Sequence, residues 1–300
     1  MTMTQRTALV TGGTRGIGKA ICLELAKADF HVVIGGRTLS AGQSVDSFSD
    51  GEPLPGSLEQ TRAEIEAIGG SASFAVMDLL DNASVEAAAD RALADRGCID
   101  VLVNNAIMST AQSSTLFTLD FSMEMFQREM QVNFFGALAL VKRVLPNMLE
   151  HGGGRVINMS ARSFYRNLPA PGRGGPRLSY TASKAALSRV AGSLRAEYGR
   201  QGILAFDVDP GPCLTEKADR AMTALGYDRS IFAPLSAPAS VVRFLADAPV
   251  EELPANGSHV MAQEFAVNRG IHAPWREGID APSRVELAQF LPVATGGVDG

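Results

Sequence analysis

Short runs of apolar residues recur along the chain, separated by longer stretches in which apolar positions follow one another every three or four residues. The short runs are rich in Val, Ile, Leu and Phe and lack strict alternation with polar residues. Such runs are typical of strands buried on both faces of a parallel sheet. They predict strands at Ala8–Thr11, Val32–Gly35, Phe74–Met77, Val101–Asn104, Val156–Met159, Leu204–Val208 and His259–Ala262.

Segments with helical periodicity lie between the predicted strands. They predict helices at Ile17–Ala28, Leu58–Ile68, Ala83–Asp95, Tyr180–Tyr198 and Ala239–Ala246, and a long helix within Asp120–Glu150. Strands and helices that alternate this regularly predict an α/β fold. We expect a Rossmann-like, doubly wound parallel sheet of about seven strands with helices on both faces.

Two segments interrupt this alternation, and a tail follows the last strand. Ser40–Gly56 is rich in Ser, Asp, Gly and Pro and predicts a surface loop. Leu168–Pro176 contains three prolines and three glycines, which excludes a helix or a central strand. In the tail, Ser283–Glu286 resembles a capping box that opens a short helix, and Thr295–Gly300 is expected to fray.

The composition indicates one large domain and argues against several kinds of partner and site. A chain of 300 residues, 46% of them hydrophobic, can bury the core of one large domain, and a net charge of −5 gives no reason to expect nucleic acid or an anionic membrane as partner. The three cysteines, Cys22, Cys98 and Cys213, lie far apart, which argues against a disulfide framework and against a bound metal. With no apolar signal region and no run long enough to span a membrane, a cytoplasmic protein is expected.

A glycine-rich turn, Gly12–Gly18, joins the first predicted strand to the first predicted helix. Glycines let the chain turn sharply and bring backbone N–H groups close to a pyrophosphate, and the helix N-terminus adds the positive end of its dipole. The candidate phosphate-binding residues of the turn are Gly12, Thr14, Arg15, Gly16, Ile17 and Gly18.

Two other interpretations of this turn stay open at this point. The spacing from Gly13 to Gly18 and Lys19 also matches a P-loop, although Ala20 stands where a P-loop needs a Ser or Thr hydroxyl for Mg²⁺. The turn could also be a glycine turn that binds no ligand.

The end of the second strand indicates which dinucleotide binds. NAD-binding Rossmann units carry an acidic residue there, which accepts hydrogen bonds from the ribose hydroxyls. Here Gly36 takes that place and Arg37 follows, while Arg15 in the glycine turn could approach the same region. Two guanidinium groups near the adenosine ribose suit a 2′-phosphate. We therefore expect NADP(H) as the cofactor.

Tyr180 and Lys184 open a predicted helix at positions i and i+4, so both side chains share one helix face. Hydride addition to a carbonyl produces an alkoxide that must be protonated. Tyrosine, with an ordinary pKa near 10, is a poor base for the reverse reaction. A nearby lysine cation, together with the positive nicotinamide of the oxidised cofactor, favours tyrosinate and lowers that pKa. The pair therefore predicts proton transfer by the phenol, assisted by the ammonium.

Together these motifs resemble the short-chain dehydrogenase/reductase family, over about residues 6–265. The glycine turn, including Thr11, matches the family's TGxxxGxG. The resemblance implies that Asp78 and Leu79 touch the adenine, that Asn133 belongs to a proton relay, and that Tyr180 and Lys184 are catalytic. It further implies cofactor contacts from Asn105 and Ala106 of Asn104–Ala106 (the family's NNAG) and from Pro210, Gly211 and Thr215 (the PGxxxT segment). Tyr180 and Lys184 are expected to contact the cofactor as well.

The chain departs from the family pattern at several places. Ile107 replaces the last glycine of NNAG, and Pro53–Ser57 matches a PLPGS insert found in some members. Ala161 stands at the position of the family's catalytic serine. Ser160, one place earlier, should face away from Ala161 in an extended chain, whereas Ser163, two places later, should face the same side. Ser163 is therefore the candidate replacement.

The resemblance also implies the domain plan: one Rossmann-like domain over residues 1–267, with a segment covering the substrate at 213–232, and a C-terminal extension at 268–300. Members of the family usually form dimers or tetramers, so a homodimer or homotetramer is expected. The covering segment and the tail carry apolar side chains that favour a fairly bulky, apolar substrate. They are Leu214, Met222, Leu225, Tyr227, Ile231, Phe232 and Trp275.

The leading hypothesis is an NADP-dependent oxidoreductase that interconverts a carbonyl and an alcohol on an apolar small molecule, acting as a ketoreductase. Two alternatives stay open. Ala161 could leave a family member without redox turnover, which binds NADP as a sensor or scaffold. Tyr180 could instead serve as the acid/base of a non-redox lyase or isomerase.

Overall fold

Seven parallel strands form one sheet in the computed structural model, which describes residues 5–42, 54–109, 118–162, 178–216, 218–219 and 232–275. The strand order is β3-β2-β1-β4-β5-β6-β7. The strands are β1 (Thr7–Thr11), β2 (His31–Gly36), β3 (Ser71–Val76), β4 (Val101–Asn104), β5 (Gly154–Met159), β6 (Ile203–Asp209) and β7 (His259–Met261). The predicted fold class is confirmed, and each predicted strand matches an observed one to within three residues at either end.

The helices of the described residues also follow the predicted pattern, except that α10 was not predicted. They are α1 (Gly16–Lys27), α2 (Leu58–Ala67), α3 (Asn82–Arg96), α5 (Met123–Met130), α6 (Gly136–Glu150), α7 (Leu178–Tyr198), α9 (Ser236–Asp247) and α10 (Ala262–Asn268). Three of them begin where a polar side chain caps the first turn: Ser57, Asp81 and Ser122 each accept a hydrogen bond from a backbone N–H of the helix that follows.

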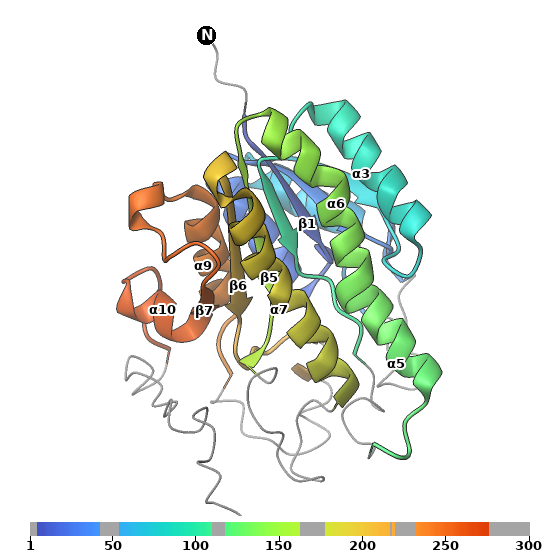
Figure 1. Cartoon of the computed structure of the whole chain (residues 1–300). Helices are drawn as coiled ribbons and strands as arrows, with labels where there is room; N and C mark the ends of the chain where they lie inside the picture. The colour runs from blue at the N-terminus through green and yellow to red at the C-terminus, as the bar shows by residue number, and fades with distance from the viewer. Residues whose placement is uncertain are drawn as a thin grey trace, which may run out of the picture.

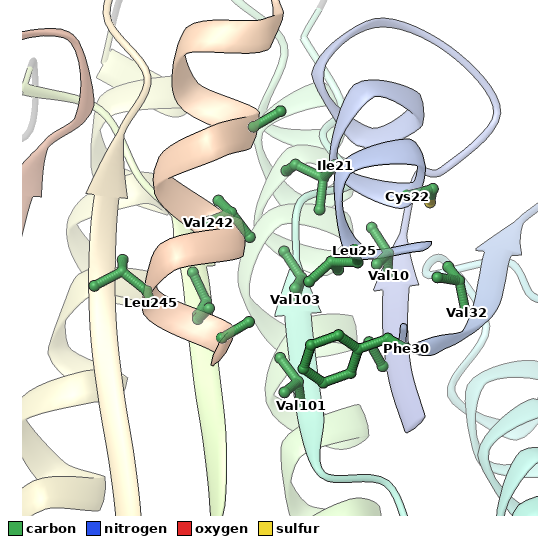
Figure 2. Close-up of a cluster of buried hydrophobic side chains, with 14 of the residues drawn as sticks. Val10, Ile21, Cys22, Leu25, Phe30, Val32, Val101, Val103, Val242 and Leu245 are labelled. Carbon is green, nitrogen blue, oxygen red and sulfur yellow. The ribbon is translucent and has the colours of Figure 1, made fainter. Parts of the chain in front are cut away.

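The helices cover the sheet on both faces, as Figure 1 shows with α3, α6 and α7 in front of the strands. Residues of α1, α2, α9 and α10 pack on the opposite face. There, Val242 of α9 points toward Ile21 and Leu25 of α1, while Leu245 of the same helix points away from α1 (Figure 2). A second core, with Val85, Val141 and Ala191 among its members, lies under α3, α6 and α7. Each face of the sheet thus has its own hydrophobic core.

The strand order changes direction at β1, which lies between β2 and β4. In an open α/β sheet, the crevice at such a switch point, beyond the carboxyl ends of the strands, binds ligands. The turn after β1 and the segment after β4 meet at this edge, and the ends of β5 and β6 lie beside them.

Three details differ from the prediction. The long helix predicted within Asp120–Glu150 is interrupted by a π-helical turn, η1 (Gln131–Phe135), so α5 and α6 are separate elements. The last strand ends at Met261 rather than at Ala262, because α10 begins at Ala262. No side chain caps the first turn of α10, so the sequence carries no capping signal for this helix. Short 3₁₀ turns at Gly199–Gln201 and Val250–Glu252 were also not predicted.

Some predictions fall outside the described residues. These are most of the Ser40–Gly56 loop, the Leu168–Pro176 segment, Ser163, most of the covering segment 213–232 and the tail beyond Trp275, with the expected capping box at Ser283–Glu286. The boundary between residues 267 and 268 stays a prediction. Within the described part of the chain, none of the helices is long and apolar enough to cross a membrane.

Candidate active site

The glycine turn after β1 adopts a backbone that only glycine accommodates well. Gly12 and Gly16 have φ angles of 68° and 53°. A Cβ on Gly18 would lie 2.2 Å from the Gly12 carbonyl oxygen and 2.4 Å from Nδ2 of Asn105. The first turn of α1 is therefore pressed against the end of β1, with backbone exposed toward the crevice.

The segment after β4 is tied to this turn by hydrogen bonds. The Thr11 hydroxyl accepts from the backbone N–H groups of Asn105 and Ala106, both at 3.0 Å, and Asn105 Nδ2 donates to the Thr11 carbonyl at 2.9 Å. Asn105 thus acts here as a brace between two loops. Ile107, the departure from NNAG, is 48% exposed and contributes its side chain to the same crevice.

A cavity of about 500 Å³ lies at this edge of the sheet. Of the predicted cofactor residues, it is lined by Gly12, Thr14, Arg15, Gly16, Ile17, Gly18, Arg37, Asp78, Leu79, Asn105, Ala106 and Thr215. The predicted contacts to phosphate, ribose and adenine therefore come together in one place. Tyr180 and Lys184, on α7, and Pro210 and Gly211, which follow β6, do not line this cavity.

Two arginines stand at the ribose end of the cavity. Arg37 is largely exposed, and its Nη1 lies 3.9 Å from Oδ2 of Asp78, a loose and solvated ion pair. Arg15 donates from Nε to the Pro55 carbonyl at 3.0 Å. Two guanidinium groups at one end of a cavity can bind a phosphate dianion.

The PLPGS insert contributes to this end of the cavity, which sequence reasoning did not predict. Leu54 is buried and lines the cavity. Gly56 has a φ angle of 92°, and a Cβ there would lie 2.1 Å from the Thr14 carbonyl oxygen. The described part of the insert therefore packs closely on the glycine turn, a contact that the match to PLPGS did not predict.

The turn already holds an anionic oxygen in the structure. The backbone N–H of Gly16 donates to Oε1 of Glu216 at 3.4 Å, and the other carboxylate oxygen of Glu216 is buried without a hydrogen-bond partner. A carboxylate at this amide occupies the kind of position that a phosphate oxygen takes at a helix N-terminus. The residues present thus fit a dinucleotide pyrophosphate.

The Pro210–Gly211 turn follows β6 and is held by residues that the sequence did not single out. Gly211 has a φ angle of 65° and donates from its backbone N–H to Asp209 at 2.8 Å. The buried Gln263 of α10 donates from Nε2 to the carbonyls of Pro210 and Pro212, each at 3.0 Å. This clamp depends on α10, an element without a sequence signal.

Helix α7 carries Tyr180 and Lys184 one turn apart, as predicted. Tyr180 is partly buried, whereas Lys184 is only 2% exposed and donates from Nζ to the Met159 carbonyl at 2.6 Å. The ammonium therefore sits at the end of β5, beneath the helix.

The π-helical turn directs Asn133 toward α7. Asn133 Nδ2 donates to the Ser183 hydroxyl at 3.0 Å and to the Met108 carbonyl at 2.9 Å, and Oδ1 accepts from the Met108 N–H at 2.7 Å. Among the described residues no hydrogen bond links the Asn133 side chain to Tyr180 or Lys184. Asn133 lies beside α7, and its amide holds the segment after β4; its role in a proton relay stays a prediction.

Lys184 was expected to lower the pKa of Tyr180, but in the structure without cofactor the pKa of Tyr180 is raised. Burial raises the pKa of Tyr180, and the carboxylates of Asp209 and Glu129 raise it further. Burial lowers the pKa of Lys184 to about 8, while the charge of Asp207 opposes that fall. Without a cofactor charge, the phenol is therefore held protonated at neutral pH. Glu129, fully buried on α5, had no sequence signal.

The family's serine position is occupied by Ala161, just past the end of β5. The neighbouring Ser160 is 3% exposed, and its hydroxyl lies 2.6 Å from that of Ser188 on α7. Ser160 is thus turned beneath the helix, as expected from strand alternation. Ser163 lies outside the described residues, so its replacement of the serine stays a prediction.

Sequence comparison finds relatives among oxidoreductases. The chain is 34% identical over 195 residues to the uncharacterized oxidoreductase Rv1543 of Mycobacterium tuberculosis, a match that covers 64% of this chain and 50% of that protein. It is 33% identical over 193 residues to a fatty acyl-CoA reductase of Acinetobacter baylyi, over 64% of this chain and 57% of the relative. The chain thus matches little more than half the length of these relatives.

Solved structures share the fold. A short-chain dehydrogenase/reductase from Burkholderia xenovorans superimposes with a TM-score of 0.71 at 24% identity, covering 86% of this chain and 95% of that one. A 7α-hydroxysteroid dehydrogenase complexed with NADH gives 0.67 at 24% identity, over 85% and 92% of the two chains. ElxO with NADP bound gives 0.70 at 22% identity, over 86% and 97%.

The family model for short chain dehydrogenases matches residues 6–50 and 53–225, which is most of this chain. The match includes the glycine turn, the braced segment after β4, the catalytic helix and the Pro210–Gly211 turn. Enzymes of this family use nicotinamide cofactors, and the residues that line the cavity fit the phosphate and ribose groups of such a molecule. The chain belongs to the short-chain dehydrogenase family of oxidoreductases.

Proposed function

We propose that this protein is an NADP-dependent carbonyl reductase that acts on an apolar small molecule. The observation that carries the proposal is the pair on α7: a phenol whose pKa is raised by burial and two carboxylates, one turn before a buried ammonium. A phenol held protonated at neutral pH suits the donation of a proton to a carbonyl oxygen as that oxygen gains negative charge.

Each group has a defined task in this proposal. Bound NADPH supplies the hydride when the cofactor occupies the cavity. Tyr180 donates the proton at its hydroxyl, and Lys184, fixed by the Met159 carbonyl, places a positive charge beside the phenol. Asn133 holds the segment after β4 against α7. The Gln263 clamp keeps the Pro210–Gly211 turn in place for the carboxamide end of the cofactor.

The choice of NADP over NAD rests on the ribose end of the cavity. Gly36 offers no carboxylate to the ribose hydroxyls, and Arg15 and Arg37 both line the cavity there. A 2′-phosphate would meet two guanidinium groups that the ribose hydroxyls of NAD cannot satisfy. ElxO, of the same fold, is a protein with NADP bound.

The substrate class is proposed from the apolar residues near the Pro210–Gly211 turn. Cys213, Ala233 and Ala237 form a small buried cluster, and Trp275 packs against it, so the tail approaches the expected covering segment. Burial raises the pKa of the Cys213 thiol to about 12, so the thiol is an apolar filler. Apolar side chains at this place support the proposal of a bulky, apolar carbonyl compound as substrate.

Replacing Tyr180 with Phe tests the proposal. NADPH oxidation would be followed at the nicotinamide absorbance band with a panel of apolar ketones and aldehydes. We expect Y180F to lose turnover by at least about a hundredfold, since general acid catalysis contributes at least that factor. NADPH binding, followed by fluorescence titration, should stay nearly intact because phosphate and ribose contacts dominate it. Lys184→Ala should weaken both.

Tyr198→Phe provides the matched control, because Tyr198 ends the same helix and packs against the core under it. Turnover by Y180F at the wild-type rate would refute the redox mechanism. A second candidate function is a protein that binds NADPH but turns over no carbonyl compound. One observation favours it, namely that Ala161 stands at the position of the family's serine. Binding of NADPH by the wild-type protein without any oxidation across the panel would favour that function.

A further inference from the structure

A buried ion pair lies at the turn after β6 and has no task in the function proposed above. Asp209, the last residue of β6, is 3% exposed. Its Oδ1 accepts a hydrogen bond from the Gly211 N–H at 2.8 Å, and its Oδ2 accepts one from Nε of Arg162 at 2.8 Å. A carboxylate is buried without a large penalty only when it has such partners. One oxygen of Asp209 is thus bound to the turn, and the other to an arginine.

The path of β5 brings Arg162 to this carboxylate. After its last strand residue the chain continues beside β6, where the backbone N–H of Ser160 donates to the Val208 carbonyl at 2.7 Å. Arg162 follows two residues later, at the carboxyl end of β6, and its side chain is 27% exposed. It is also the residue directly after Ala161. The segment that carries the family's serine position is therefore tied to the turn after β6.

Helix α10 approaches the same guanidinium group from the other side. Asp209 pairs in register with Met261, the last residue of β7, so α10 begins beside the end of β6. Oε1 of Glu264 lies 3.7 Å from Nη2 of Arg162. The preceding residue, Gln263, holds the two proline carbonyls of the turn. Arg162 therefore joins the ends of β5 and β6 to α10, with a carboxylate on either side of it.

The turn itself has little freedom between these contacts. Gly211 has a φ angle of 65°, and a Cβ there would lie 2.4 Å from Nε2 of Gln263. Among the described residues, Arg162 is the one cation within ion-pair distance of Asp209. Without the guanidinium group, the buried carboxylate would keep a single donor and would be drawn toward water. The hydrogen bond from the Gly211 N–H would then no longer be held in place.

We propose that Arg162 is a positioning residue for the nicotinamide half of the cofactor: it fixes the Asp209 carboxylate, which in turn fixes the Pro210–Gly211 turn that meets the carboxamide. This inference deepens the proposed function and rests on it for the place of the carboxamide. Neither Arg162 nor Asp209 lines the cavity that takes the phosphate and ribose groups. The effect of Arg162 should therefore be confined to one half of the cofactor.

The test compares the binding of the whole cofactor with the binding of its adenosine half. Isothermal titration calorimetry would give the Kd of NADP⁺ and of 2′,5′-ADP, which carries the adenine and the 2′-phosphate but has no nicotinamide. Arg162→Met keeps the length of the side chain and removes its charge and donors. We expect R162M to weaken NADP⁺ binding by about tenfold, since a charge-assisted hydrogen bond is lost. The Kd of 2′,5′-ADP should stay unchanged.

Two further variants separate positioning from general stability. Arg162→Lys keeps the charge and one donor toward Asp209, so it should recover most of the NADP⁺ affinity. Arg155→Met is the matched control. Arg155 also belongs to β5, but its guanidinium donates to the Leu245 and Ala248 carbonyls at 2.8 Å and 2.9 Å. R155M should leave both Kd values unchanged, even where it lowers the melting temperature as much as R162M does.

Asp209→Asn examines the other member of the pair. The asparagine keeps an oxygen that can accept from the Gly211 N–H, but it no longer attracts the guanidinium group. D209N should weaken NADP⁺ binding in the same selective way. Because the two residues act as one unit, the double variant R162M/D209N should lose no more affinity than the more affected single variant. If R162M does not fold, D209N carries the test.

The outcomes distinguish this inference from the proposed function. An unchanged Kd of NADP⁺ in R162M and D209N would overturn the role of Arg162, and so would an equal loss for NADP⁺ and 2′,5′-ADP. If the wild-type protein binds NADP⁺ but turns over no carbonyl, the proposed reductase activity is refuted, and the binding comparison still tests Arg162. A wild-type protein that binds neither ligand would refute both.

Discussion

Ala161 is the residue at which this site departs most from the pattern of its family. A serine hydroxyl at that position would polarise the substrate carbonyl and stabilise the developing oxyanion. The structure removes Ser160 as a substitute, since its hydroxyl is turned to Ser188 beneath α7. Ser163 remains the candidate from the sequence.

Ser163→Ala should therefore lower kcat by about 10²–10³, the usual loss for one oxyanion donor. Steady-state kinetics with the best carbonyl substrate provide the measurement, and Ser160→Ala is the matched control, expected to change kcat little. If S163A is silent and Ala161→Ser raises activity, nothing has replaced the missing hydroxyl, and the role of Ser163 would have to be abandoned.

Arg37 carries the prediction about the cofactor. NADPH should bind more tightly than NADH, and Arg37→Asp should weaken NADPH binding by about tenfold or more, because a charge-assisted hydrogen bond is replaced by repulsion. The measurement is the Kd of each cofactor by fluorescence titration. Arg143→Ala on α6, where the arginine pairs with Asp90 on α3, is the control. Equal affinities of the unmodified protein for the two cofactors would contradict the assignment.

Among the elements, strands were predicted with more success than the details of helices. Apolar runs identify buried parallel strands because both faces of such strands must be covered. The π-helical turn at Gln131–Phe135 had no such signal, since it depends on how the Asn133 side chain meets Met108 and Ser183. The α10 helix, which supplies Gln263, is too short for periodicity to reveal it.

The pairing of β2 with β3 creates a pH-sensitive contact. His31 is buried, and its two ring nitrogens lie 2.7 Å and 2.9 Å from the hydroxyls of Ser71 and Ser73. Burial lowers its pKa below the usual value, and the charge of Arg96 adds to this effect. The unfolded chain therefore binds a proton at higher pH than the folded protein does.

The contribution of His31 to the free energy of unfolding should therefore be fully present above about pH 6.5, the ordinary pKa of histidine. It should be lost as the pH falls below that value. His31→Gln removes the titrating group, so its stability should change less between about pH 7 and pH 5, as measured by urea unfolding. His151→Gln, at an exposed position after α6, is the control. An equal pH dependence in H31Q and wild type would contradict this assignment.

At the scale of the whole molecule, the sheet order determined which predicted motifs would meet. Motifs such as Gly12–Gly18 and Asn104–Ala106 could be placed at the carboxyl ends of strands because alternation of strand and helix implies a parallel sheet. Contacts such as those of Gln263 with Pro210 and of Asn158 with Asp207 join residues far apart in sequence. They carry no local signature, so only the folded chain reveals them.

The division of the core by the sheet has a practical consequence for engineering. We propose proton transfer by Tyr180 of α7, while α9 packs against α1 on the opposite face of the sheet (Figure 2). Thermostability could thus be selected by repacking around Val242 and Leu245 with little interference with turnover. The same search under α7 would alter the residues that orient Lys184. In directed evolution of this protein, core substitutions should therefore be tolerated better on the face covered by α1 and α9 than on the face covered by α7.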